Sequence, residues 1–181
     1  MDYANMVCAH VSNEYVTGYF SDTVNFNPDS GGTPKNKTAA GLSDAYVSQF
    51  SYGNFQGVTT WGGSEPLKID SGYGITTDWS GNVYCSGAFA GDSFGTTSKG
   101  NCDAVVAKYT SNLSLITATT WGGTGSDGCS DICANYWDRL FVTGGYKSTV
   151  DFDPRASVDN HTSKGGVADC YLMKLMPDGS W

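Results

Sequence analysis

Residues 74–89 read GITTDWSGNVYCSGAF, and two other stretches of the chain repeat this pattern. Residues 131–146 read DICANYWDRLFVTGGY, and residues 5–20 read NMVCAHVSNEYVTGYF. In each copy a polar turn separates two short runs that are rich in Val, Tyr, Thr and Phe. Turn residues between two β-prone runs indicate a hairpin. The sequence therefore predicts three antiparallel hairpins that are copies of one another.

Two further phrases follow these hairpins in a constant order. An Asp before a short apolar run occurs as DAYVSQF (44–50), DAVVAKY (103–109) and DCYLMKL (169–175). The phrase TTWGG occurs at 59–63 and 119–123, so that Trp61 and Trp121 are 60 residues apart. The second copy is thus expected to hold strands over 73–78, 82–89, 103–109 and 115–121. The third copy stops before its TTWGG strand.

A four-stranded antiparallel unit at this period is typical of a β-propeller blade. One small sheet cannot bury both of its faces alone, so the copies must stack against each other. We expect a single all-β domain over 1–181 that contains three β-propeller-type blades. The expected blades cover 1–63, 64–123 and 124–181, and the last lacks its outer strand.

These phrases resemble the bacterial seven-bladed β-propeller repeat family, known as the SBBP repeat. Its pattern runs W-x-x-x-x-G-G, then I-x-x-D-x-x-G-N-V-Y-V-T-G, often V-D-F-D-P, and then D-A-F-V-x-K. The matching residues here are Ile75, Asp78, Gly81, Asn82, Val83, Tyr84, Gly87, Val150 to Pro154, Asp103, Ala104, Val105 and Lys108. The resemblance covers nearly the whole chain. It implies a secreted or cell-surface propeller, but no single activity.

The number of copies suggests a role in assembly. A closed propeller needs about four to eight blades, and this sequence holds three. Open sheet edges are sites of strand pairing, and head-to-tail contacts give rings or filaments. We therefore expect an extracellular structural protein, a self-associating subunit of a glycosylated fibre or oligomer. The alternatives are a secreted, lectin-like carbohydrate-binding propeller and a fragment of a secreted hydrolase.

Charge and hydropathy exclude other partners. The formal net charge is −8 and the ten basic residues are scattered, so electrostatic binding to nucleic acid or to anionic lipid is not expected. No run is long and apolar enough to span a membrane. The first residues, MDYANMVCAHV, lack the basic start and the apolar run of a signal peptide.

Cysteines and glycosylation motifs favour an extracellular or cell-surface location. Six cysteines are an even number that suits disulfides. We expect a bridge between Cys85 and Cys102 across a hairpin, and a second, local bridge between Cys129 and Cys133 is possible. Cys8 and Cys170 would remain, to join if the ends meet or through a neighbouring subunit. Three N-x-S/T motifs begin at Asn36, Asn112 and Asn160, and each is predicted to lie in an accessible loop that carries an N-linked glycan.

Calcium is the one cofactor that the sequence suggests. The inserts TVNFNPD (23–29) and TVDFDPR (149–155) place oxygen ligands at alternate positions, as hard cations require. The candidate ligands are Asn25, Asn27, Asp29, Asp151 and Asp153. The same spacing also fits a strand with polar residues outside and a proline stop. A zinc site at Cys129 and Cys133 is not expected, because no second ligand pair has useful spacing.

The sequence does not indicate an enzyme. His10 aligns with Trp79 and Tyr136, and His161 lies within a glycosylation motif, so that neither belongs to a triad pattern. Asp44, Asp103 and Asp169 share one repeat position, which indicates binding of turn amides at a strand start. Trp61 and Trp121 are expected to pack between blades, and stacking on a sugar is the alternative. With 11 tyrosines, an exposed surface for a sugar or a partner also remains open.

Overall fold

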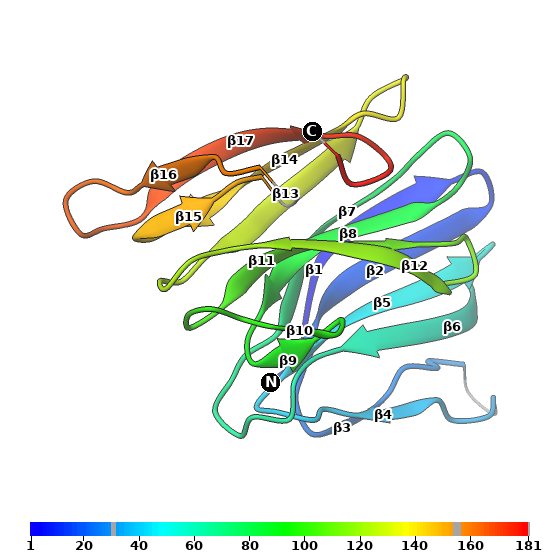
Figure 1. The fold of residues 1–181 in the computed structure, drawn as a ribbon. Coiled ribbons are helices and arrows are strands. Elements are labelled where there is room, and N and C mark those ends of the chain that lie inside the picture. Colours follow the sequence, from blue (N-terminus) through cyan, green and yellow to red (C-terminus); the bar gives the residue numbers. More distant parts are fainter. Residues whose placement is uncertain (30–31, 154–156, 181) are drawn as a thin grey trace.

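The computed structural model describes residues 1–29, 32–153 and 157–180 (Figure 1). Every regular element in these ranges is a β-strand, which confirms the all-β prediction. Three antiparallel sheets contain the long strands, and each lies within one of the expected repeats. Pro154, Arg155 and Trp181, which belong to the insert and to the C-terminus, lie outside the described residues.

The first two sheets have four strands each and share one strand order. The first is ordered β1 (Tyr3–His10), β2 (Asn13–Phe20), β5 (Asp44–Ser51), β6 (Asn54–Trp61). The second is ordered β7 (Ser71–Thr77), β8 (Val83–Phe89), β11 (Asp103–Tyr109), β12 (Leu115–Trp121). These four strands match the expected ranges to within two residues.

The third sheet contains three strands in the described part of the chain. They are ordered β13 (Gly128–Ala134), β14 (Leu140–Tyr146) and β17 (Asp169–Leu175). In the first two sheets the fourth strands, β6 and β12, form the edge opposite β1 and β7. In the third sheet the third strand, β17, forms the corresponding edge in the described residues.

A two-stranded hairpin is inserted between the second and third long strands of every repeat. The hairpins are β3 (Thr23–Asn25) with β4 (Asn36–Thr38), β9 (Asp92–Ser93) with β10 (Thr96–Thr97), and β15 (Thr149–Asp151) with β16 (Asn160–Thr162). The middle hairpin is the shortest, because only the first and third repeats carry the inserts TVNFNPD and TVDFDPR. Asn25 pairs with Asn36, and Asp151 pairs with Asn160, so the first and third hairpins share one register.

The sheets stack face to face, and the second lies between the other two (Figure 1). The innermost strands β1, β7 and β13 contact one another in sequence. One apolar core lies between the first and second sheets, around Tyr15, Trp61 and Tyr109. Another lies between the second and third, around Tyr84 and Trp121. Each sheet thus buries a face only where another sheet covers it.

A β-bulge recurs at the same point of each innermost strand. The register shifts between Ala4 and Met6, between Gly72 and Gly74, and between Cys129 and Asp131. Opposite each bulge the second strand holds a glycine: Gly18, Gly87 and Gly144. A Cβ atom at these glycines would lie 1.9, 2.1 and 2.0 Å from a backbone carbonyl oxygen of the bulged strand. The glycine of the repeated phrase is therefore required by the close approach of two backbones.

The first hairpin is shorter than its two copies, and this corrects the alignment of His10. His10 pairs directly with Asn13 and closes a two-residue turn, whereas Thr77 pairs with Val83 across a five-residue loop. Strand pairing thus makes His10, and not Ala9, equivalent to Asp78. The prediction that His10 occupies the position of Trp79 is wrong by one residue, because sequence alignment did not allow for the tighter turn.

Candidate functional site

Two buried carboxylates join neighbouring sheets. Asp70 is 0% exposed, and its carboxylate accepts the amide N–H of Gly63 at 3.1 Å and that of Ala90 at 2.7 Å. Gly63 follows the outer strand of the first sheet, and Ala90 follows β8 of the second. Asp127 repeats the arrangement with Gly123 (2.8 Å) and Lys147 (2.9 Å) between the second and third sheets. We call Asp70 and Asp127 the junction carboxylates.

Three other aspartates hold the turn before the third long strand of each repeat. Asp44 accepts the amide of Ala40, Asp103 that of Lys99 and Asp169 that of Lys164, each at 3.1 Å. The side chains of Asp44 and Asp103 also fill the space beside Gly62 and Gly122, where a Cβ would lie 2.4 and 2.3 Å from the carboxylate. The prediction that these aspartates bind turn amides is confirmed.

Burial of these carboxyl groups makes stability depend on pH. Burial, with smaller contributions from the nearby Asp44 and Glu65, raises the pKa of Asp70 from 3.8 to about 6. The hydrogen bonds from Ala90 and Gly63 act to lower this pKa. Burial also raises the pKa of Asp44 and of Asp103. The folded state therefore binds protons more tightly than the unfolded state. Stability from this source is fully present below pH 4 and is lost as the pH rises through 6.

We expect the thermal unfolding midpoint to be several degrees higher at pH 4.5 than at pH 7.5. In the Asp70→Asn variant the difference should shrink, because the carboxyl group whose pKa burial raises to about 6 no longer titrates. Circular dichroism melts at the two pH values measure both quantities. A midpoint that increases from pH 4.5 to 7.5 would contradict the assignment.

Three of the five candidate calcium ligands, Asn25, Asn27 and Asp151, accept hydrogen bonds from turn amides. The side-chain oxygen of Asn25 accepts the amide of Asn27 at 3.1 Å, and that of Asn27 accepts the amide of Asp29 at 3.0 Å. Asp151 likewise accepts the amide of Asp153 at 3.1 Å. Asn25 and Asp151 each accept a second amide from the returning side of the hairpin, at 2.8 Å. The alternating oxygens are thus explained by local turn formation.

The described ranges contain no group of three or more His, Cys, Asp or Glu residues arranged to hold a metal ion. His161 lies on β16, exposed to solvent, with its Nε2 3.0 Å from the Asp159 carboxylate. His10 closes the β1–β2 hairpin of the first repeat, whereas His161 belongs to the β15–β16 hairpin of the third repeat. The two histidines thus lie in different repeats of the fold.

The expected disulfides are not formed, and all six cysteines are free. Cys85 pairs with Ala107 in the middle of the second sheet, whereas Cys102 precedes the strand that pairs at Phe89. Five residues along a strand separate the two levels by roughly 16 Å, too far for a bridge. The predicted Cys85–Cys102 bridge is therefore wrong, because Cys85 lies deep within the hairpin and not at its loop.

The other cysteine pairs are also separated. Cys129 and Cys133 lie on one strand, and their partners on β14 are three residues apart, or roughly 10 Å. Cys8 packs against the core of the first two sheets, while Cys170 lies exposed on β17 of the third. Burial raises the pKa of the Cys8, Cys85 and Cys129 thiols to about 12. These thiols behave as small apolar core residues.

The three candidate glycosylation sites are all accessible. Asn36 and Asn160 are exposed at equivalent positions of the β3–β4 and β15–β16 hairpins. Asn112 is exposed in the turn between β11 and β12. A cross-strand hydroxyl contact of 2.8 Å holds Thr38 of the first motif to Thr23, and one of the same length holds Thr162 of the third to Thr149.

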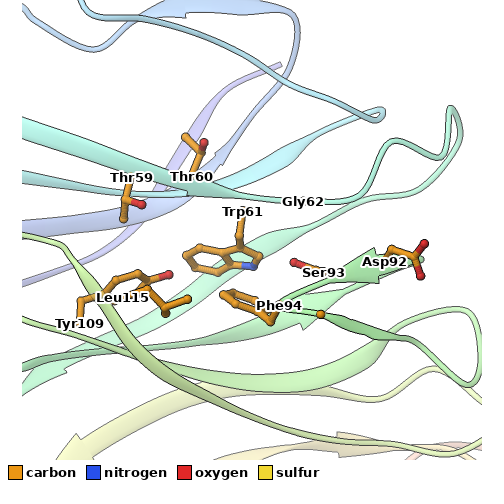
Figure 2. Close-up of a pocket in the computed structure, with 10 residues that line it drawn as sticks. Thr59, Thr60, Trp61, Gly62, Asp92, Ser93, Phe94, Tyr109 and Leu115 are labelled. Carbon is orange, nitrogen blue, oxygen red and sulfur yellow. The ribbon is translucent and has the colours of Figure 1, made fainter.

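Trp61 lies in a groove between the outer strands of the first and second sheets (Figure 2). The groove has a volume of about 460 Å³. Trp61 itself is buried, with its ring centroid 5.8 Å from that of Phe94. Tyr109 and Leu115 face it from the second sheet (Figure 2). Trp61 and its counterpart Trp121 are thus packing residues between sheets, as the sequence predicts.

Three large aromatic side chains are exposed at the tips of two neighbouring hairpins. Trp79 is 74% exposed in the β7–β8 turn, and Tyr136 and Trp137 are 76% and 70% exposed in the β13–β14 turn. The ring centroids of Trp79 and Tyr136 are 5.6 Å apart, and those of Tyr136 and Trp137 are 6.0 Å apart. We call these three residues the aromatic cluster.

The outward faces of the first and third sheets expose side chains that are core residues elsewhere in the fold. Val47 and Val106 are 0% and 4% exposed, but Leu172, at the same register position of the third sheet, is 72% exposed. On the opposite face, Ile75 and Ile132 are each 4% exposed, whereas the equivalent Val7 is 62% exposed. We call these two surfaces the Val7 face and the Leu172 face.

No protein-family model and no curated protein matches this chain. In the part of the chain that the structure describes, no helix has the length and apolar character needed to cross a membrane.

Sequence reasoning missed the junction carboxylates, the aromatic cluster and the two end faces. The sequence does hold a signal for the junction carboxylates, because Asp70 and Asp127 each lie a few residues after a TTWGG phrase. Trp79, Tyr136 and Trp137 also stand in turns, where polar residues and glycine are the rule.

Proposed function

We propose that this chain is an assembly protein that binds copies of itself head to tail, with its sheets acting as β-propeller-type blades. The observation that carries the proposal is the contrast in exposure at Val7 and Leu172. Both positions are buried wherever a neighbouring sheet is present. A second copy can cover the Leu172 face of one chain with the Val7 face of the next, and so reproduce the junctions already inside the chain.

The chemistry of the two faces supports this pairing. Beside Leu172, the Leu172 face carries Phe141 and Cys170, at positions where the first sheet buries Tyr15 and Ala45. Strand β17 pairs only with β14 in the described residues, so its second edge can accept a strand. The two faces differ from each other, which makes the contact heterologous, and such contacts build rings or filaments.

We further propose an extracellular or cell-surface location with N-linked glycans at Asn36, Asn112 and Asn160. The exposure of all three residues supports this location. The disulfide argument no longer contributes, because the fold keeps the cysteines apart. Asn36 and Asn112 lie on other strands than Val7 and Leu172. Asn160 adjoins His161, which lines one pocket with Cys170 and Leu172, so a glycan at Asn160 would lie beside the Leu172 face.

Sedimentation velocity at micromolar concentration tests the self-association. We expect the 181-residue chain to form oligomers, and the Val7→Glu and Leu172→Glu variants each to sediment as monomers, because a buried unpaired charge opposes the contact. Leu67→Glu is the matched control: Leu67 is exposed in the loop between the first two sheets, and its variant should still associate.

A mixture of the two variants distinguishes head-to-tail from symmetric contact. The Val7→Glu chain keeps an intact Leu172 face, and the Leu172→Glu chain keeps an intact Val7 face. Mixed in equal amounts, they should form dimers and no larger species. A monomeric parent chain, or a mixture that remains monomeric beside an associating parent, would refute the proposal.

A further inference from the structure

We propose that the aromatic cluster binds the pyranose ring of a neutral carbohydrate. The starting point is that the fold does not need aromatic residues at these positions. The first hairpin turns with Val11 and Ser12 in their place. Yet the neighbouring turns of the second and third sheets both carry large rings. The ring centroid of Tyr136 lies 5.6 Å from that of Trp79 and 6.0 Å from that of Trp137.

The two turns are fixed before any ligand arrives. In the β7–β8 turn, the Asp78 carboxylate accepts the amide of Asn82 at 2.8 Å and the hydroxyl of Tyr84 at 3.0 Å. In the β13–β14 turn, the side-chain oxygen of Asn135 accepts the amides of Trp137 and Arg139, both at 3.0 Å. Backbone hydrogen bonds close both loops in the same pattern. Rigid loops reduce the entropy that is lost on binding.

One hydrogen bond links the two turns to each other. The amide of Trp79 donates to the Asp138 carboxylate at 2.8 Å. The aromatic cluster therefore spans two sheets and keeps its shape as long as they stay stacked. Its three rings are between 70% and 76% exposed, so most of their surface is free to contact a ligand.

The size and surroundings of the aromatic cluster favour a sugar over a protein partner. Three side chains offer a few hundred Å² at most, whereas a specific protein interface buries about 1,200–2,000 Å² in total. A pyranose has apolar C–H faces that stack on rings and a rim of hydroxyl groups. Asp138, whose carboxylate binds the Trp79 amide, and the exposed Arg139, which follows it in the chain, offer an acceptor and donors for that rim.

A proline-rich peptide is a weaker match. Such peptides also dock on aromatic residues, but proline has no N–H to donate to the Asp138 carboxylate. Nucleic acid is disfavoured by the net charge of −8, because phosphate binding depends on basic residues. The ligand class that matches both the rings and their polar neighbours is a neutral saccharide.

A glycan array probed with the fluorescently labelled chain tests the proposal. We expect binding to at least one neutral oligosaccharide, and a loss of at least about tenfold in affinity for Trp79→Ala and for Trp137→Ala, equivalent to about 1.4 kcal/mol. Tyr52→Ala is the matched control, because Tyr52 is 82% exposed on the β5–β6 turn of the first sheet. Thermal melts of all variants check that they remain folded.

Three outcomes would overturn the proposal: no neutral glycan binds, binding persists in the Trp79→Ala/Trp137→Ala double variant, or a decaproline peptide binds at the cluster in place of any sugar. The Val7→Glu and Leu172→Glu variants should keep their glycan binding. The proposal is therefore independent of the self-association, and each can fail alone.

Discussion

Replacement of Gly87 by alanine is expected to lower the free energy of unfolding by about 3 kcal/mol. A Cβ at this position would lie 2.1 Å from the carbonyl oxygen of Ser71 and 3.1 Å from its carbonyl carbon. Both are backbone atoms of the bulged strand β7, so no side chain can rotate away to make room. The strand must shift, and it lies between the first and third sheets, where close packing resists movement.

Chemical denaturation of the Gly87→Ala variant, followed by tryptophan fluorescence, measures the loss. Gly57→Ala is the matched control, because Gly57 also lies within a strand, β6, but a Cβ there meets no atom within 4 Å. Alanine at that edge position should leave stability unchanged or raise it by up to about 1 kcal/mol. Equal losses in the two variants would show that the approach to Ser71 is not the cause.

The second large effect is expected for Asp70→Ala, which removes the carboxylate between the first and second sheets. Two buried amide groups, of Gly63 and Ala90, would lose their acceptor. An unsatisfied buried donor costs about 1–3 kcal/mol, so we expect a loss of about 3 kcal/mol at pH 7.5. Asp127→Ala should have a similar effect at the next junction.

Asp70→Asn provides the graded control for this prediction. Its amide oxygen can accept one of the two N–H groups, and its NH₂ group cannot accept the other. The asparagine variant should therefore lie between the parent and Asp70→Ala in urea denaturation at pH 7.5. An alanine variant as stable as the parent would show that the junction carboxylate contributes little to the fold.

Local features of the fold were accessible to sequence reasoning. The turn at Asp78–Asn82 and the strands around it follow from turn chemistry and β-propensity, which depend on residues close in the chain. The role of Asp103 also followed, because its partner Lys99 lies four residues away.

Features that join distant segments were not accessible in the same way. The partners of Asp70 belong to two different sheets, and no local pattern reveals both. The cysteine prediction failed because the level of Cys85 in its hairpin depends on strand register. Leu172 and Val47 are similar residues in similar phrases, and only the presence of a covering sheet distinguishes their burial.

The junction carboxylates also determine the order in which the molecule comes apart. The first and third sheets each take part in one such junction, whereas the second takes part in both. Either terminal sheet can thus detach while the other junction survives, but the central one cannot open without breaking both. Proteases that act on transient openings would therefore digest the chain from its two ends, and the middle repeat would resist digestion for the longest time.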